Sequence, residues 1–349
     1  MIDIDFASLR RIGFTQTLAS QLHLLPETPA DARLARITEI QRDWLTMHDG
    51  HDEFRARVLR SVHDATPAVG DWALSTTLGH EHWLCAVVPP VTHIARRGHD
   101  GRHHSLVSNV DTALLVMGLD KDFNPRRLER YLAIVKTANV EPVVVLSKAD
   151  VATDTQQRMA LLRDRLPRNI ALLAVNTLSD SVVTQLAPWL GAGQTLVLLG
   201  SSGAGKSSLT NTLAQAGQHT GSVRDSDHRG RHTTTSRSLH RCASGACIID
   251  TPGLRSWQPD ADQASIAASF DDIEALASQC QFRDCRHATE PGCAVRGVVD
   301  ADRLHNYHKL LREARRSEQT PLDRVAEVAK WKVLHRAAQA RVREKKGEV

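Results

Sequence analysis

The sequence is poor in aromatic residues and has no long hydrophobic run. Its 349 residues include 6 Phe, 6 Trp and 2 Tyr, or 4% aromatic. No apolar run approaches the roughly 20 residues that a membrane-spanning helix needs. The first residues, Met1-Ile2-Asp3-Ile4-Asp5, lack the basic and then apolar layout of a signal peptide. We therefore expect a cytoplasmic protein without a membrane partner. We also expect the protein to be a monomer.

The charges are unevenly distributed along the chain. Residues 302–349 hold 13 Lys and Arg against 7 Asp and Glu, whereas residues 1–301 hold 31 against 33. A basic end on a near-neutral body suggests an anionic partner that contacts mainly this end. A solvated helix face rich in Arg is the equally plausible alternative. The low aromatic content argues against base recognition by stacking, so phosphate and shape contacts are expected if the partner is a nucleic acid.

Residues 1–104 are expected to form a helical lead-in followed by an OB-like β-barrel. Short alternating segments recur at intervals of 10–15 residues, which is typical of a small barrel. The expected strands are 35–40, 54–59, one that follows the turn at 67–72, and 83–88.

Residues 105–263 change pattern and predict a doubly wound α/β domain. Four continuous apolar runs have the character of strands buried on both faces of a parallel sheet. These runs are 113–117, 143–146, 170–175 and 195–199, with helices expected at 125–138 and 155–166. Residues 264–349 are expected to form a helical domain, with helices near 262–279 and 301–317 and a basic last helix beginning at Thr320.

A phosphate-binding loop follows the strand at 195–199. Its sequence is Gly200-Ser201-Ser202-Gly203-Ala204-Gly205-Lys206-Ser207, which fits G-x-x-x-x-G-K-[ST] between a strand and a helix. The glycines let backbone N–H groups surround phosphates at a helix N-terminus. Lys206 is expected to reach the β- and γ-phosphates, and the Ser207 hydroxyl to bind Mg²⁺.

The choice of guanine rests on Ser147-Lys148-Ala149-Asp150, at the end of the strand at 143–146. A carboxylate such as Asp150 can accept hydrogen bonds from the N1–H and the exocyclic amine of guanine, donors that adenine lacks. The aliphatic part of Lys148 can cover the base. Most GTPases carry Asn or Thr where Ser147 stands, so the guanine pocket departs from the common pattern at this position.

The segment Asp250-Thr251-Pro252-Gly253 supplies a third nucleotide motif. Asp250 is expected to hold Mg²⁺ through water, and the Gly253 N–H to bond the γ-phosphate. Residues 217–236 are polar and read as a mobile switch, in which Thr233, Thr234 or Thr235 meets Mg²⁺. Leu254 stands where many GTPases place a water-orienting Gln, so we consider His232 as the catalytic group, with a solvated switch histidine as the alternative.

Three of the six cysteines lie close to a histidine in the C-terminal part. Cys280, Cys285, His287 and Cys293 provide three thiolates and one imidazole within 14 residues, a complete tetrahedral set for a structural Zn²⁺. Scattered reduced cysteines are the alternative. Cys85, Cys242 and Cys247 lie in strand-like runs and are expected to be small core residues.

These motifs, in this order, resemble the ribosome small subunit-dependent GTPase A family of circularly permuted bacterial GTPases. The base-reading motif at Asp150 precedes the phosphate loop at Gly200, and the resemblance extends over nearly the whole chain. The segments that carry it are 67–72, 108–111, 147–150, Gly200 to Ser208, 231–235, 250–253 and 285–293. The resemblance implies an N-terminal OB domain, a central GTPase domain and a C-terminal zinc domain. It also implies that Ser208 binds GTP and that Asn176 lies near the guanine, although the usual Ser-Ala is missing there.

The family resemblance implies binding to the 30S ribosomal subunit and its 16S rRNA, late in maturation, with GTP hydrolysis to GDP stimulated by the subunit. Two rival hypotheses remain. The first is an RNA-binding assembly scaffold that binds guanine nucleotide with negligible turnover. The second is an ATP-dependent P-loop enzyme such as a small-molecule kinase.

Overall fold

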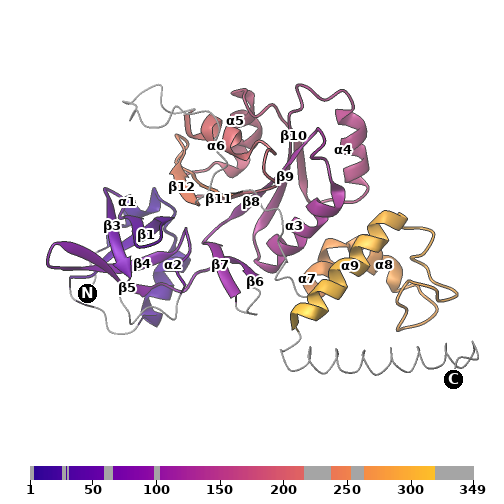
Figure 1. Cartoon of the computed structure of the whole chain (residues 1–349), viewed down its shortest axis with the longest axis horizontal. Helices are drawn as coiled ribbons and strands as arrows, with labels where there is room; N and C mark the ends of the chain where they lie inside the picture. The colour runs from indigo at the N-terminus through magenta and orange to yellow at the C-terminus, as the bar shows by residue number, and fades with distance from the viewer. Residues whose placement is uncertain are drawn as a thin grey trace, which may run out of the picture.

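The computed structural model describes residues 4–25, 29, 31–58, 66–97, 103–215, 237–252 and 263–318. Three groups of elements follow one another along the chain, a small barrel, a central sheet with helices, and a set of C-terminal helices (Figure 1). None of the described helices is long and apolar enough to cross a membrane. His232, Thr233, Thr234, Thr235, Gly253, Leu254 and the last helix predicted from Thr320 lie outside the described residues.

The lead-in consists of short helices that pack against the barrel. Helix α1 (Phe6–Arg10) begins after Asp5, whose carboxylate accepts from the N–H groups of Ala7 and Ser8, and α2 (Gln16–Gln21) is capped by Thr15. A 3₁₀ turn, η1 (Leu22–Leu24), follows. The buried side chains of Leu9, Ile12, Phe14 and Leu18 belong to the same apolar cluster as Trp72 of the barrel.

Five strands close into the predicted OB-like barrel. They are β1 (Arg33–Ile40), β2 (Leu45–His48), β3 (Glu53–Val58), β4 (Trp72–Leu78) and β5 (Glu81–Val87). Their order is β1-β2-β3-β5-β4, the barrel closes by pairing of β4 with β1, and only β3 and β5 are parallel. Apolar residues such as Ala35, Ile37, Met47 and Leu84 fill the interior. Strand β2 was not predicted from the sequence, because it has only four residues.

The central sheet has the order β10-β9-β8-β11-β13-β12. The strands are β8 (Thr112–Gly118), β9 (Glu141–Ser147), β10 (Ala171–Ala174), β11 (Thr195–Leu199), β12 (Ser238–Arg241) and β13 (Cys247–Asp250). Neighbouring strands are parallel except β12, which runs antiparallel to β13. Strands β8, β9 and β11 are buried on both faces, which is why their sequences are apolar without alternation.

Helices cover both faces of this sheet. Residues of α3 (Pro125–Thr137) and α4 (Thr155–Arg163) share one apolar cluster with the sheet. Residues of α5 (Ser181–Leu186), followed by η3 (Ala187–Trp189), and of α6 (Lys206–Gln215) share the cluster of the opposite face. The predicted doubly wound α/β domain is therefore confirmed.

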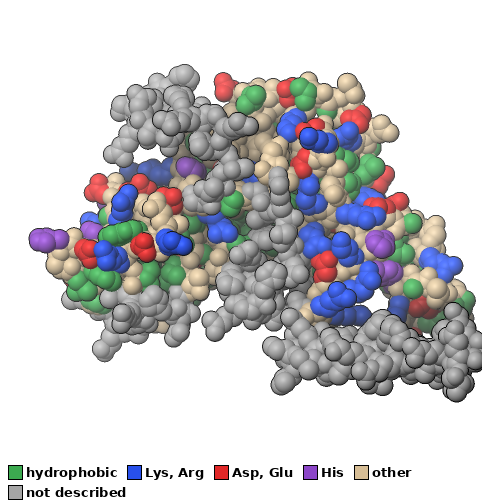
Figure 2. Space-filling view, viewed as in Figure 1, with side chains coloured by type: hydrophobic (Ala, Val, Ile, Leu, Met, Phe, Trp, Pro, Cys, Tyr) green, Lys and Arg blue, Asp and Glu red, His purple; other side chains and the backbone are tan. Residues whose placement is uncertain are grey.

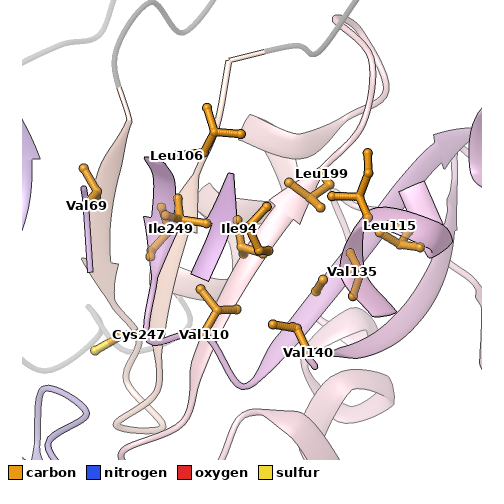
Figure 3. Packing of buried hydrophobic residues seen from close by; sticks show 14 of the residues in the cluster. Val69, Ile94, Leu106, Val110, Leu115, Val135, Val140, Leu199, Cys247 and Ile249 are labelled. Atoms are coloured by element: carbon orange, nitrogen blue, oxygen red, sulfur yellow. The ribbon is translucent and has the colours of Figure 1, made fainter. Parts of the chain in front are cut away.

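A β-hairpin that the sequence analysis did not predict covers the rest of the first face. Its strands are β6 (His93–Arg97) and β7 (His103–Ser108), and the boundary expected at residue 104 falls inside β7. In Figure 3, Ile94 and Leu106 of the hairpin lie in one apolar cluster with Leu199 of β11 and Ile249 of β13. The hairpin thus takes the place of a covering helix beside β11 and β13.

The C-terminal helices are α7 (Gln263–Ser269), α8 (Asp271–Ala277) and α9 (Ala301–Glu318). The single helix expected over 262–279 is divided at Phe270, whose buried ring packs in a cluster with Ile266 and Ile273. This cluster includes Ala133 of α3, so the C-terminal helices pack on the helix that covers the first face of the sheet.

Candidate nucleotide and metal sites

The residues predicted to bind nucleotide lie at the carboxyl ends of four strands. The phosphate loop follows β11, the motif at Ser147 ends β9, Asn176 follows β10, and Asp250 ends β13. In open α/β sheets ligands bind at this edge of the strands. The motifs occur in permuted order along the sequence, but the sheet brings them together at one edge.

Glycines determine the path of the phosphate loop. A Cβ on Gly200 would clash with the carbonyl oxygen of Val116 in β8, while Gly203 and Gly205 have φ angles of +81° and +93°. Glycine adopts these angles without steric penalty, which lets consecutive N–H groups turn toward a bound anion.

The Lys206 side chain folds back over this loop and is buried. Its Nζ donates to the carbonyl oxygens of Gly200 (3.1 Å) and Ser201 (2.9 Å). Burial lowers the pKa of Lys206, and the carboxylates of Asp250 and Asp122 oppose this effect. The ammonium group is thus fixed beside the loop, where it can pair with a negatively charged phosphate.

The Ser207 hydroxyl and the Asp250 carboxylate lie together below the loop. Ser207 Oγ donates to Asp250 Oδ2 at 3.1 Å, and the neighbouring Thr251 hydroxyl donates to Leu198 O. A hydroxyl and a carboxylate beside a phosphate-binding loop are the oxygen ligands that Mg²⁺ takes in P-loop proteins, directly or through water. The two residues therefore fit a Mg²⁺ site.

Ser147 and Lys148 of the predicted guanine motif both donate hydrogen bonds to the phosphate loop. The buried Ser147 hydroxyl donates to Ala204 O at 2.6 Å, and Lys148 Nζ donates to Gly203 O at 2.8 Å. Lys148 has a φ of +62°, a backbone conformation that non-glycine residues rarely adopt. Ser147 thus connects the predicted guanine motif to the phosphate loop, at the position where most GTPases carry Asn or Thr.

The remaining pocket residues are more exposed. Asp150 is exposed, and the neighbouring Ala149 is half-buried. Asn176 follows β10, and its Oδ1 accepts from the N–H of Leu178 at 3.0 Å, so its side chain is engaged in its own turn. Beside it, buried Thr177 approaches Gly205 and accepts from Thr212 through its carbonyl oxygen.

Two acidic residues of the site were missed by the sequence analysis. Asp120 and Asp122 lie in the loop after β8, where they contact Lys148 and Ser201. Their position directly after an apolar strand could have revealed them, because the recognised motifs also lie directly after apolar strands.

The four predicted metal ligands come together in the C-terminal part. One ligand atom from each of Cys280, Cys285, His287 and Cys293 lies within 4.8 Å of all the others. His287 Nδ1 is 3.6 Å from Cys280 Sγ and 3.5 Å from Cys293 Sγ. These separations fit the edge of roughly 3.6 Å of a tetrahedron with Zn–S of about 2.3 Å and Zn–N of about 2.0–2.1 Å. The group could hold a metal ion.

The loop that carries these ligands is held by its own hydrogen bonds. The Glu290 carboxylate accepts from the N–H groups of Arg286, Ala288 and Thr289, and the N–H of Ala294 lies 3.4 Å from Cys280 Sγ. Backbone bonds to its own N–H and that of Ala288 lower the pKa of Glu290 to about 2. The other cysteines behave as predicted for core residues, since Cys242 and Cys247 are buried and Cys85 is half-buried.

Comparison with known proteins decides the family. The chain is 47% identical over 269 residues to the small ribosomal subunit biogenesis GTPase RsgA of Xanthomonas campestris pv. campestris (strain B100), covering 74% of this chain and 73% of the relative. The sequence profile of the RsgA GTPase family matches residues 88–260. The chain belongs to the RsgA GTPase family. It is therefore a GTP hydrolase, and the family resemblance drawn from its motifs is confirmed.

Two solved structures share the fold. The crystal structure of YjeQ from Thermotoga maritima matches with a TM-score of 0.60 at 20% identity, over 81% of this chain and 98% of that one. YloQ, described as a circularly permuted GTPase, matches with a TM-score of 0.57 at 21% identity, over 84% of this chain and all of that one. The barrel and the permuted order of the sheet are thus properties of a known fold.

Proposed function

We propose that this GTPase acts in the biogenesis of the small ribosomal subunit. It binds the 30S subunit through 16S rRNA as a cytoplasmic monomer, and the subunit stimulates its hydrolysis of GTP. The observation that carries the proposal is the 47% identity to an RsgA that is named for this process. The assembled phosphate loop and guanine motif support it.

We propose the following roles for the residues predicted to bind nucleotide. Lys206 neutralises the β- and γ-phosphates, Ser207 and Asp250 hold the Mg²⁺ that accompanies GTP, and Asp150 accepts from the guanine base. Ser208 and the loop from Gly200 bind phosphate through their backbone. Gly253, one of the threonines at 233–235 and the catalytic His232 complete the site in this proposal.

We assign Zn²⁺ to the cluster of three cysteines and His287. All four positions of a tetrahedron are filled by protein, so the ion serves the fold of the C-terminal part rather than the reaction.

Basic side chains suit the C-terminal part to rRNA. In Figure 2, Lys and Arg gather where α3, α8 and α9 lie. Among residues 263–318, the described C-terminal part, the exposed basic residues are Arg283, Arg286, Arg296, Lys309, Arg312, Arg315 and Arg316. Such a surface contacts phosphates and predicts binding that weakens as salt increases.

Phosphate release with and without purified 30S particles tests the proposal. We expect stimulation by 30S and none by 50S, together with co-sedimentation that differs between GDP and a non-hydrolysable GTP analogue. Release that stays at background in both conditions would leave only an RNA-binding scaffold.

Asp150→Asn tests the choice of base. Loss of the carboxylate should weaken GTP binding by about 10-fold or more, since one pocket hydrogen bond contributes about 1–3 kcal/mol. Asp154→Asn, four residues further on at the exposed N-terminus of α4, is the matched control and should bind GTP normally. Equal binding of ATP and GTP by the unmodified protein would favour the ATP-dependent rival.

A further inference from the structure

The loop after β8 connects the guanine motif to the phosphate loop. The N–H of Leu119 donates to Ser147 O at 2.9 Å, so the loop starts on the backbone of the guanine motif. Gly118 lies so close to Asp120 that a Cβ would stand 2.6 Å from its carboxylate, and its N–H donates to Asp122 Oδ2 at 3.0 Å. The segment from 118 to 122 therefore turns back tightly and places two carboxylates at the site.

Asp120 binds the end of the Lys148 side chain. Lys148 Nζ lies 2.8 Å from Asp120 Oδ2 and 2.8 Å from Gly203 O, so two acceptors on different loops hold one ammonium. The hydrogen bond from Lys148 is the main reason that the pKa of Asp120 is lowered. The second carboxylate oxygen accepts from the N–H of Asp122 and so fixes the orientation of the group.

Asp122 binds the phosphate loop itself. Its Oδ1 accepts from Ser201 Oγ at 2.5 Å and from the Arg127 guanidinium at 2.5 Å, while Oδ2 accepts from Gly118. Only 14% of the Asp122 side chain is exposed, so water competes little for these bonds. Ser201 is the first variable residue of the phosphate loop, directly after Gly200.

We infer that Asp120 and Asp122 are positioning residues of the nucleotide site. Asp120 holds Lys148 where its aliphatic part covers the guanine base, and Asp122 holds the start of the phosphate loop through Ser201. This inference rests on the proposed roles of Lys148 and the phosphate loop.

The physical reason is the flexibility of the groups that are held. A long lysine side chain loses rotamer entropy when it is fixed, and part of this cost is removed from binding when the free protein already holds the ammonium. The phosphate loop contains three glycines and gains order in the same way from Ser201. Both effects precede nucleotide binding, so GTP and GDP should be affected alike.

The first test measures the affinity of the full-length protein for fluorescent GDP and GTP analogues. Asp120→Ala should weaken both by about 3- to 10-fold, because the pair with Lys148 is about one-third exposed and such pairs contribute modestly. Asp120→Glu, which keeps the charge, should recover part of the loss. Asp164→Ala removes an exposed carboxylate at the C-terminal end of α4 and should leave both affinities unchanged.

A double-mutant cycle separates positioning from a general structural effect. Lys148→Met keeps an aliphatic side chain over the base but has no ammonium for Asp120. If Asp120 acts through Lys148, adding Asp120→Ala to Lys148→Met should have no further effect. An unchanged 3- to 10-fold loss in the Lys148→Met background would overturn the assignment of Asp120.

The corresponding cycle for Asp122 uses Ser201→Ala. Asp122→Asn and Ser201→Ala should each weaken GDP binding, and the double variant should bind no worse than Asp122→Asn alone. Thermal unfolding of each variant identifies any that fail to fold, in which case Ser201→Ala alone decides the question. Normal GDP affinity of folded Ser201→Ala would refute the role of Asp122. Failure of the unmodified protein to bind GDP would refute the proposed function instead.

Discussion

The central sheet meets the barrel through a continuous apolar core, whereas its helix α3 meets the C-terminal helices through an apolar contact at Ala133 and a network of charged side chains. On the barrel side, one cluster runs from Leu9 and Trp72 to Ile249, and β1 pairs with β12 at Glu39 and Ser238. On the other side, Glu129 of α3 is buried against Arg303 of α9 at 2.8 Å. We call these two contact regions the barrel joint and the C-terminal joint. Each contains a fully buried arginine, Arg36 or Arg303, but the partners of the two arginines differ.

In the barrel joint, Arg36 is bonded to neutral oxygens. It donates to Ile12 O (2.5 Å), Thr195 Oγ1 (2.9 Å) and Asn109 O (3.0 Å), and more weakly to Gly70 O. Burial lowers the pKa of Arg36, while Cys247, Asp111 and Asp71 oppose this. One side chain thus joins the lead-in, the barrel and the start of two strands of the central sheet.

In the C-terminal joint, Arg303 is bonded to carboxylates. It pairs with Glu129 and with Asp272 (2.6 Å), and Glu129 also accepts from Asn306 at 2.5 Å. Around them, Arg165 pairs with Asp300 and Asp302, and Arg130 with Glu313. Removal of the arginine should therefore have different consequences in the two joints, because in this one it would leave the buried Glu129 carboxylate with only the more distant Arg165, at 3.7 Å, as a cation.

Removal of the proposed Zn²⁺ should have the largest effect, and only on the C-terminal side. Structural Zn²⁺ contributes folding free energy directly, about 10–16 kcal/mol of apparent binding in isolated zinc fingers. Cys293→Ser or a strong chelator should therefore unfold the loop at 280–293 and loosen α9 while the barrel stays folded. Hydrogen exchange resolved by segment measures this, and equal loss of protection in the barrel would contradict the separation of the two joints.

Arg303→Met should follow, with a loss of about 3–5 kcal/mol in the stability of the C-terminal joint. The reason is the buried Glu129 carboxylate, which loses its closest cation. Urea unfolding followed in this region gives the change. Adding Glu129→Gln should restore much of the loss, whereas a double variant as unstable as Arg303→Met would show that the charge is not the cause.

Asp71 should make the barrel joint sensitive to pH. Burial raises the pKa of Asp71 from 3.8 to about 6, so its stabilising contribution is complete below about pH 4 and is lost as the pH rises through 6. Two pKa units correspond to about 3 kcal/mol. Stability measured between pH 4 and pH 7 should fall less in Asp71→Asn than in the unmodified protein, and parallel curves would rule this out.

Arg36→Met should have the smallest effect, about 2 kcal/mol. The bonds to neutral oxygens are lost, but none of them is to a carboxylate, and a guanidinium no longer has to be buried. Arg36→Lys should not do better, because an ammonium cannot reach the same four oxygens with the geometry of a planar guanidinium. A loss as large as that of Arg303→Met would remove the contrast between the joints.

The sequence predicted the elements that depend on local pattern. The apolar runs at 113–117 and 195–199 became β8 and β11 within two residues, and helix α3 begins at Pro125 as expected. The short β2 and the hairpin of β6 and β7 were missed, since strands of four to six residues with polar side chains have little periodicity to recognise.

The phosphate loop, the guanine motif and the cysteine cluster were recognisable because each is a contiguous segment whose spacing sets its chemistry. The tertiary structure alone decided how these segments support one another. Asp122 reaches Ser201 across 79 positions, and Arg303 reaches Glu129 across 174. Arg36 approaches Thr195 across 159 positions. No local sequence pattern identifies such partners. Their contact depends on the order of the strands in the sheet and on which face of each helix becomes buried.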